Sequence, residues 1–174
     1  IGQKKATVLA HRLNLSTGTT WDAIPRYLTR EDIPKIGANI IIACVDNRSA
    51  RAEIHAGADH YGGPCYTPDL GNTSKAGQVI LGTPKSRHQR ECGPRLPTAP
   101  ELYPELVDTS LPEDDTPACS TAESLERQDL FINDTLATHA LNLLWQLLRN
   151  HQINHHGVFI DTTLSLTTPM PINP

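Results

Sequence analysis

The chain has 174 residues, enough for one domain with a sizeable core. Its formal net charge of −4 at pH 7 argues against nucleic acid as the main partner. No apolar run approaches the length of a membrane span and no secretory signal opens the sequence, so it predicts no membrane association and a cytoplasmic location.

The first half of the chain predicts alternating helices and strands, the pattern of an α/β fold with a parallel sheet. The apolar run "NIIIACVD" predicts a central parallel strand covered on both faces, with Asp46 at its carboxyl end. The predicted elements in chain order are helix 1–15, strand 19–29, a loop or turn at 30–37, strand 39–46 and helix 47–58.

The second half predicts an antiparallel hairpin at the far side of the sheet, and later a helical region. Seven of the fourteen prolines fall in residues 83–118, so this stretch is interpreted as a long surface crossover loop. Ser120 and Glu123 form a capping box at the start of the helical region. The predicted elements are a hairpin at 62–84 with its turn at 71–77, the crossover 83–118, one or two helices in 119–151 with the later part well buried, strand 157–167 and a loose tail at 168–174.

The four cysteines form no close pairs, so a structural zinc site is not predicted and reduced thiols are expected. Cys119 directly precedes the capped helix start, where the helix dipole lowers a thiol pKa; the alternative is a buried structural cysteine. Cys44 lies inside the apolar strand and is expected to react slowest.

Asp46 and the pair Lys4 and Lys5 are the other candidates. In one interpretation, Asp46 faces a nucleotide or a metal ion at the end of the strand. In the other, either Asp46 or Asn47 caps the next helix. Cations at a helix start oppose the helix dipole unless a phosphate lies nearby, and the alternative is a solvated surface pair. No metal-binding histidine spacing occurs.

The segments "IGQKKA" and "IIIACVDNRSAR", together with several later ones in the same order, resemble the E1-like (ThiF/MoeB) family that activates ubiquitin-like modifiers. "IGQKKA" is similar to the family's G-x-x-K-A segment, and "IIIACVDNRSAR" to its strand ending in D-N-x-x-x-R. Five further segments resemble one branch of the family, the ThiF-family proteins of bacterial PRTRC systems. They are "LGN", "GQVILG", "RLPTAPELYPELVD", "PACSTAESLERQDLFIND" and "LLWQLL…HHGVFID". The resemblance implies a Rossmann-like adenylation fold, of which residues 1–174 would be the C-terminal part, because the family's Gly-rich turn would precede Ile1.

The resemblance also implies roles for four residues. Lys5 matches the lysine that contacts the ATP phosphates, Asp46 the aspartate that holds Mg²⁺, and Cys119 the position that takes the modifier as a thioester. Arg51 matches the arginine of the same nucleotide-binding motif, without a fixed role. The implied partners are a ubiquitin-like or sulfur-carrier protein and a second copy of the chain in a homodimer.

Two functions follow from these observations. The first is an enzyme that adenylates the C-terminus of a modifier with ATP and Mg²⁺, although the stretch without the Gly-rich turn is expected to be inactive alone. The alternative is a non-catalytic E1-like module that docks a partner protein.

Overall fold

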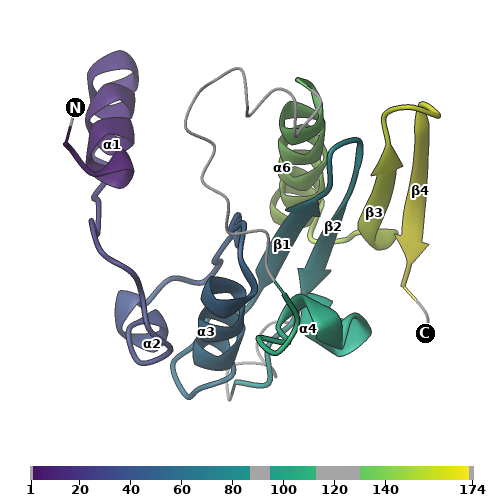
Figure 1. The fold of residues 1–174 in the computed structure, drawn as a ribbon, viewed down its shortest axis with the longest axis horizontal. Coiled ribbons are helices and arrows are strands. Elements are labelled where there is room, and N and C mark those ends of the chain that lie inside the picture. Colours follow the sequence, from purple (N-terminus) through teal and green to yellow (C-terminus); the bar gives the residue numbers. More distant parts are fainter. Residues whose placement is uncertain (1, 87–94, 113–129, 173–174) are drawn as a thin grey trace.

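The computed structural model describes residues 2–86, 95–112 and 130–172, and shows an α/β fold built on a four-stranded antiparallel sheet (Figure 1). The strand order is β1-β2-β3-β4. The elements are α1 (Lys5–Thr17), α2 (Ile33–Ile36), α3 (Arg48–Ala58), β1 (Thr67–Asn72), β2 (Ala76–Gly82), α4 (Ala99–Leu102), the 3-10 helix η2 (Pro104–Leu106), α6 (Ile132–Asn150), β3 (His155–Asp161) and β4 (Leu166–Pro171).

The sheet separates α6 from α3 and α4, which lie on its other side (Figure 1). Side chains alternate between the two faces of a strand, so Val79 and Val158 point together toward Leu136 of α6 in one buried apolar cluster. On the opposite face β2 meets the start of α4. A Cβ on Gly82 would lie 2.5 Å from Thr98 Cα, so only glycine allows this approach. The helix α1 stands apart at one end, and none of its residues is buried.

Residues 39–46 are an edge segment, so the predicted central position is wrong. Two isolated parallel bridges, Ile40 with Tyr66 and Ala43 with Asp69, join the segment to the chain at β1, which confirms the predicted parallel direction. Ile42 is 44% exposed. Among the described residues, the main-chain groups of Ile40, Ile42 and Cys44 that face away from β1 make no hydrogen bond.

A proline in the neighbouring strand explains why the segment forms bridges instead of a continuous strand. Ile41 N–H donates to Tyr66 O and Ala43 N–H donates to Pro68 O. The intervening bond of a parallel ladder would run from residue 68 N–H to Ile41 O, but Pro68 has no N–H. The apolar run is therefore extended, but the hydrogen bond between its two bridges to the β1 chain is missing.

The strand predicted at residues 19–29 is also wrong, because the structure has no strand there. Pro25 removes one ladder donor, and Trp21 and Tyr27 are exposed. Arg26 instead pairs with Asp32 (Nη1–Oδ2 2.6 Å), which also accepts from Thr29 N–H (2.9 Å) and closes the segment as a loop. The predicted turn that follows contains the short helix α2.

The predicted hairpin is confirmed as β1 and β2, but its predicted place at the far side of the sheet is wrong, since β2 lies inside. The predicted loose tail is wrong as well. Asp161 ends β3 and accepts from the N–H groups of Thr163 and Leu164, and Ser165 has a positive φ of 50°. This turn returns the chain as β4, an edge strand that tolerates Pro169 and Pro171.

The described part of the Pro-rich crossover is more ordered than a surface loop. Thr98 and Glu101 form a capping box at the start of α4. Leu96 and Ala99 are buried, and Leu96 belongs to an apolar cluster with Leu143. Residues 95–112 of the predicted surface crossover therefore include short helices and contribute side chains to the core.

The long helix α6 confirms the helical region but is only buried along one stripe. Its buried residues are Ile132, Leu136, Ala140, Leu143 and Leu144. Leu141, Trp145 and Leu148 on the outer side are exposed, so the prediction that the later part is well buried holds for one face only. The predicted capping box at Ser120 and Glu123 lies outside the described residues.

The two faces of α6 predict opposite effects for the same substitution. Leu143→Ala removes a side chain that is 3% exposed, so it should lower the free energy of unfolding by about 2–5 kcal/mol. Leu141→Ala, at a position that is 61% exposed on the same helix, should change it by less than about 0.5 kcal/mol. Urea denaturation followed by circular dichroism measures both. Equal losses would show that the outer face of α6 is buried in the protein in solution.

Candidate functional site

A cavity of about 910 Å³ opens at the carboxyl end of the edge segment. It brings together residues from the first turn of α1, the loop before α2, α3, β1 and α6. Its lining includes two of the predicted site residues, Lys5 and Asp46. The other residues of its wall are Arg26, Tyr27, Leu28, Cys44, Val45, Asn47, Ser49, Ala50, Glu53, Ile54, Leu70, Gly71, Asn72, Asn133, Leu136 and Ala137.

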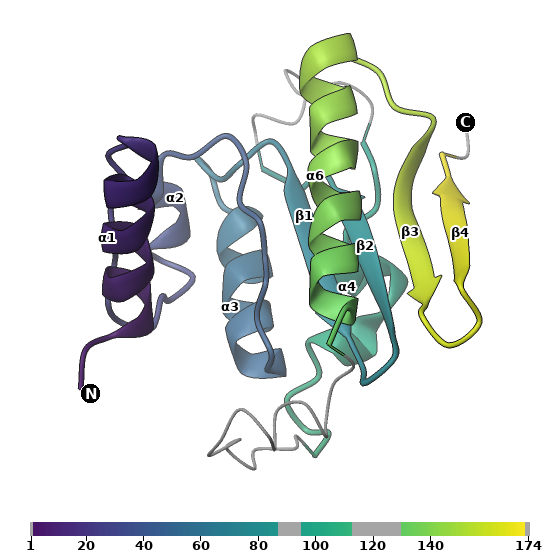
Figure 2. The ribbon, with the colours of Figure 1, turned by 90° about the horizontal axis from the view of Figure 1, so that it is seen from above.

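Three helices present their N-terminal ends to this cavity. Lys5 is the first residue of α1, Asn47 is the N-cap of α3, and Asn133 is the second residue of α6. All three helices begin on the same side of the molecule, toward the lower edge of Figure 2. Each helix N-terminus carries a partial positive charge and main-chain N–H groups without helical acceptors, so the cavity favours an anion.

Asn47, and not Asp46, caps α3. The Asn47 side-chain oxygen accepts from Ala50 N–H at 2.7 Å, which satisfies one of the free donors of the first turn. Within the described part of the chain, the Asp46 carboxylate accepts a single hydrogen bond, from the neighbouring Asn47 Nδ2 at 3.2 Å, and its side chain is exposed in the cavity wall. The alternative of Asp46 as the helix cap is therefore excluded, and its carboxylate is available to a ligand.

Lys5 is a cation without a counter-ion among the described residues. The α1 helix has no acidic residue in its first turn and no side-chain cap, so nothing in that turn offsets the charge of Lys5. The arrangement is unfavourable for the helix by itself, and an anion in the cavity would relieve it.

The other charged residues of the cavity wall are already paired. Arg26 forms two hydrogen bonds to Asp32, and this pairing holds the pKa of the Asp32 carboxyl well below its ordinary value. Glu53 accepts from the Arg30 side chain and main chain, which lowers its pKa. Lys5 and Asp46 are therefore the charges of the wall that remain open to a ligand.

Arg51 does not line the cavity. Its side chain is 6% exposed and lies behind the wall, where Nε donates to Asp69 Oδ2 at 3.1 Å. Its Nη2 donates to the main-chain oxygens of Val45 (3.0 Å) and Leu70 (3.1 Å). Arg51 can therefore reach a ligand only through the backbone that it holds.

Sequence reasoning missed the two residues that complete this buried cluster. His55 Nε2 lies 2.7 Å from Asp69 Oδ2, and both side chains are buried. The helical spacing of Arg51 and His55, four residues apart, places them on one face of α3 and could have indicated a pair. Asp69 gave no signal, because a single acid in "TPDLGN" is indistinguishable from a turn residue.

The cysteines differ from their expected states. Cys44 is a free and exposed thiol in the cavity wall, so its predicted burial is wrong. Cys65 is disulfide-bonded, and this bond does not support the expectation of reduced thiols. Reducing compartments rarely preserve disulfide bonds. Cys119 lies outside the described residues.

The described residues contain no cluster of three or more histidine, cysteine or acidic side chains that could hold a metal ion by themselves. In the same part of the chain, no helix combines the length and apolar character needed to cross a bilayer.

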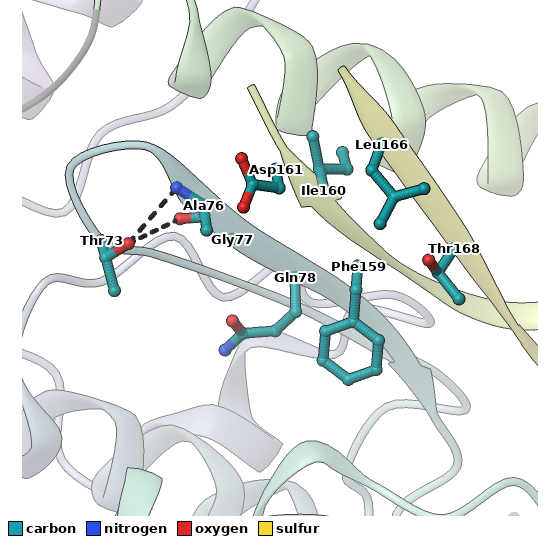
Figure 3. Close-up of a pocket in the computed structure, with 9 residues that line it drawn as sticks. All are labelled: Thr73, Ala76, Gly77, Gln78, Phe159, Ile160, Asp161, Leu166 and Thr168. Atoms are coloured by element: carbon teal, nitrogen blue, oxygen red, sulfur yellow. Dashed lines mark hydrogen bonds between the residues drawn. The ribbon is translucent and has the colours of Figure 1, made fainter. Parts of the chain in front are cut away.

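A smaller hollow of about 260 Å³ lies over β2, β3 and β4 (Figure 3). Phe159, Leu166 and Thr168 line it, and the only acid in its wall is Asp161. Asp161 already accepts from the turn that joins β3 to β4. This hollow contains none of the predicted site residues and no cation, so the larger cavity is the better candidate for a functional site.

The chain matches no protein-family model, and no curated protein matches it. The motifs in the sequence and the cavity at Lys5 and Asp46 are therefore the observations on which its function can be argued.

The environment of Cys44 predicts that its thiol is alkylated slowly near neutral pH, although the side chain is exposed. Partial burial, followed by the nearby Asp69 carboxylate, raises the pKa of Cys44 above the ordinary value of a thiol. The thiolate is the reactive form, so the rate of alkylation by iodoacetamide should keep rising with pH beyond the midpoint of glutathione. Peptide mapping by mass spectrometry as a function of pH measures the rate at this residue. A midpoint at or below that of glutathione would contradict the prediction.

Proposed function

We propose that the cavity binds the phosphates of ATP and that the protein adenylates the C-terminus of a ubiquitin-like or sulfur-carrier protein. The observation that carries the proposal is the meeting of Lys5, Asp46 and three helix N-termini in one cavity. A volume of about 910 Å³ is within the range of small-molecule sites. The Rossmann-like arrangement of the whole family domain belongs to the same proposal.

The charges of the cavity suit a nucleotide triphosphate. The N–H groups at the starts of α1, α3 and α6 would donate to phosphate oxygens, and the Lys5 ammonium would add a full positive charge. Because both sources of positive charge are part of the fold, they would stabilise negative charge that develops on the phosphates during reaction.

Asp46 fits a magnesium ion that arrives with the nucleotide. Mg²⁺ in phosphate sites is held by one or two carboxylates together with phosphate oxygens and water, so a single open carboxylate is sufficient. Bound there, the ion would neutralise phosphate charge as a Lewis acid.

The proposed reaction has two steps. A carboxylate oxygen of the modifier's C-terminus attacks the α-phosphorus, the bond to the bridging oxygen breaks, and pyrophosphate leaves. A thiolate at Cys119 then attacks the carbonyl carbon of the acyl-adenylate, AMP leaves, and a thioester forms. Arg51 supports this site indirectly through the backbone of Val45 and Leu70.

One observation also bears on the alternative of a docking module. The outer face of α6 exposes Leu141, Trp145 and Leu148 in a single stripe, which is typical of a surface that meets another protein. A homodimer or a modifier protein would both use such a surface, so this feature is compatible with either function.

Neutral replacements of the two open charges should abolish adenylation without unfolding the protein. In the complete protein with a modifier that supports the reaction, Lys5→Met should lower ATP–pyrophosphate exchange by on the order of 10²–10³-fold, since a charge that acts on the transition state is lost. Asp46→Asn should lower it by at least about 10²-fold. Radiolabelled pyrophosphate exchange measures both variants.

Neighbouring residues outside the cavity wall provide matched controls. Lys4→Met and Asp22→Asn remove the same charges at exposed positions that do not line the cavity, and should leave exchange within about 3-fold of the wild type. Wild-type exchange in the Lys5 and Asp46 variants would show that these residues have no part in nucleotide chemistry. Equal losses in the control variants would assign the effect to net charge.

The thioester step predicts a different pattern for the cysteines. In the complete protein, Cys119→Ala should keep pyrophosphate exchange but lose any modifier adduct that a reducing agent cleaves, because the thiol acts only after adenylation. Cys44→Ala, which removes the free thiol of the cavity wall, should keep both. Gel electrophoresis with and without reductant, followed by mass spectrometry, locates the adduct. An adduct that persists in Cys119→Ala excludes the assignment.

A further inference from the structure

Arg51 connects two main-chain segments of the cavity wall, the end of the edge segment and the later part of β1. The Nη2 atom donates to Val45 O, directly before Asp46, and to Leu70 O, directly before Gly71. Val45, Leu70 and Gly71 all line the cavity, whereas the guanidinium itself lies behind them. One buried side-chain atom therefore holds both main chains where the edge segment and β1 reach the site.

The position of the guanidinium is itself determined by a buried acid. Asp69 has no exposed surface, and its Oδ2 accepts from Arg51 Nε at 3.1 Å and lies 2.7 Å from His55 Nε2. Asp69 Oδ1 is buried with no hydrogen-bond partner among the described residues. Among the described residues, this carboxylate makes its hydrogen bonds through Oδ2, which is shared between Arg51 and His55, so a charge-assisted hydrogen bond holds the guanidinium next to Asp69.

The edge segment needs this bridge because its own ladder is incomplete. The bonds nearest the site are Ala43 N–H to Pro68 O (2.8 Å) and Leu70 N–H to Ala43 O (2.9 Å). Pro68 removes the next bond along, and the other edge of the segment makes none within the described residues. Two main-chain bonds by themselves are weak support for a catalytic carboxylate.

We propose that Arg51 is a positioning residue that holds Asp46 in place by bridging Val45 O and Leu70 O. The proposal rests on the proposed function for its catalytic consequence, but the bridge itself is a property of the fold. His55 contacts the same Asp69 oxygen without touching either carbonyl, so it serves as the matched control.

The bridge predicts a local effect that backbone hydrogen exchange resolves. In Arg51→Lys, the ammonium can still pair with Asp69 but cannot reproduce the planar fork that reaches two carbonyls. The amides of Ala43 and Leu70 should then exchange at least about 10-fold faster, while Val158 in β3 keeps its rate. In His55→Leu, the ratio of the Ala43 and Leu70 rates to the Val158 rate should stay within about 3-fold of the wild type.

A second readout connects the bridge to catalysis. In pyrophosphate exchange by the complete protein, Arg51→Lys should lower kcat by about 10–100-fold with a smaller change in KM for ATP, because Asp46 is misplaced although the cavity persists. The failure of the proposed function would appear as no exchange in the wild type, and the hydrogen-exchange result would be unaffected by it. Three outcomes would each overturn the proposal. The first is that the Ala43 and Leu70 amides exchange at the same rates in Arg51→Lys and His55→Leu. The others are a uniform rise in the exchange rates of all amides and the loss of folding in Arg51→Lys.

Discussion

The structure depends on a carboxylate buried in the middle of its first strand. Asp69 is fully buried, and an ionised carboxylate there costs several kcal/mol unless a cation and hydrogen bonds compensate it. Arg51 and His55 provide this compensation from one face of α3, so the helix must lie against β1 in a single register. Asp46 lies directly before the Asn47 N-cap of the same helix, in the wall of the cavity.

The cavity gathers positive potential with few charged side chains. Its wall contains two cations, and one of them, Arg26, is neutralised by Asp32. The remaining attraction for an anion comes from Lys5 and from the ends of α1, α3 and α6. Helix ends are fixed by the fold and cannot rotate away, so they provide a preorganised site that does not require a basic surface.

The open edge of the sheet follows from the same local chemistry. Pro68 interrupts the pairing of residues 39–46 with β1, and the outer main-chain groups of Ile40 and Ile42 lack partners among the described residues. Ala43 is the buried side chain of this apolar run, whereas Ile40 and Ile41 are only partly buried and Ile42 is 44% exposed. The Arg51 bridge operates where this pairing ends, which explains why a buried charge cluster is found beside an otherwise simple α/β core.

The sequence by itself determined the elements whose signals are local. Helical spacing and a C-terminal Gly18 define α1, the apolar runs define the hairpin β1–β2 and the extended segment before Asp46, and apolar periodicity defines α6. It also singled out Lys5 and Asp46, which the fold then placed in one cavity. Only the tertiary structure decided the pairing of strands, the assignment of the α3 cap to Asn47, and the burial of Asp69 with Arg51 and His55. The strand pairing and the buried cluster depend on groups that are distant in the chain, and neither strand patterning nor side-chain type reveals which distant donor will meet which acceptor. The cap is a local contact, but the two adjacent candidates Asp46 and Asn47 are both good N-cap residues, so the sequence left the choice between them open.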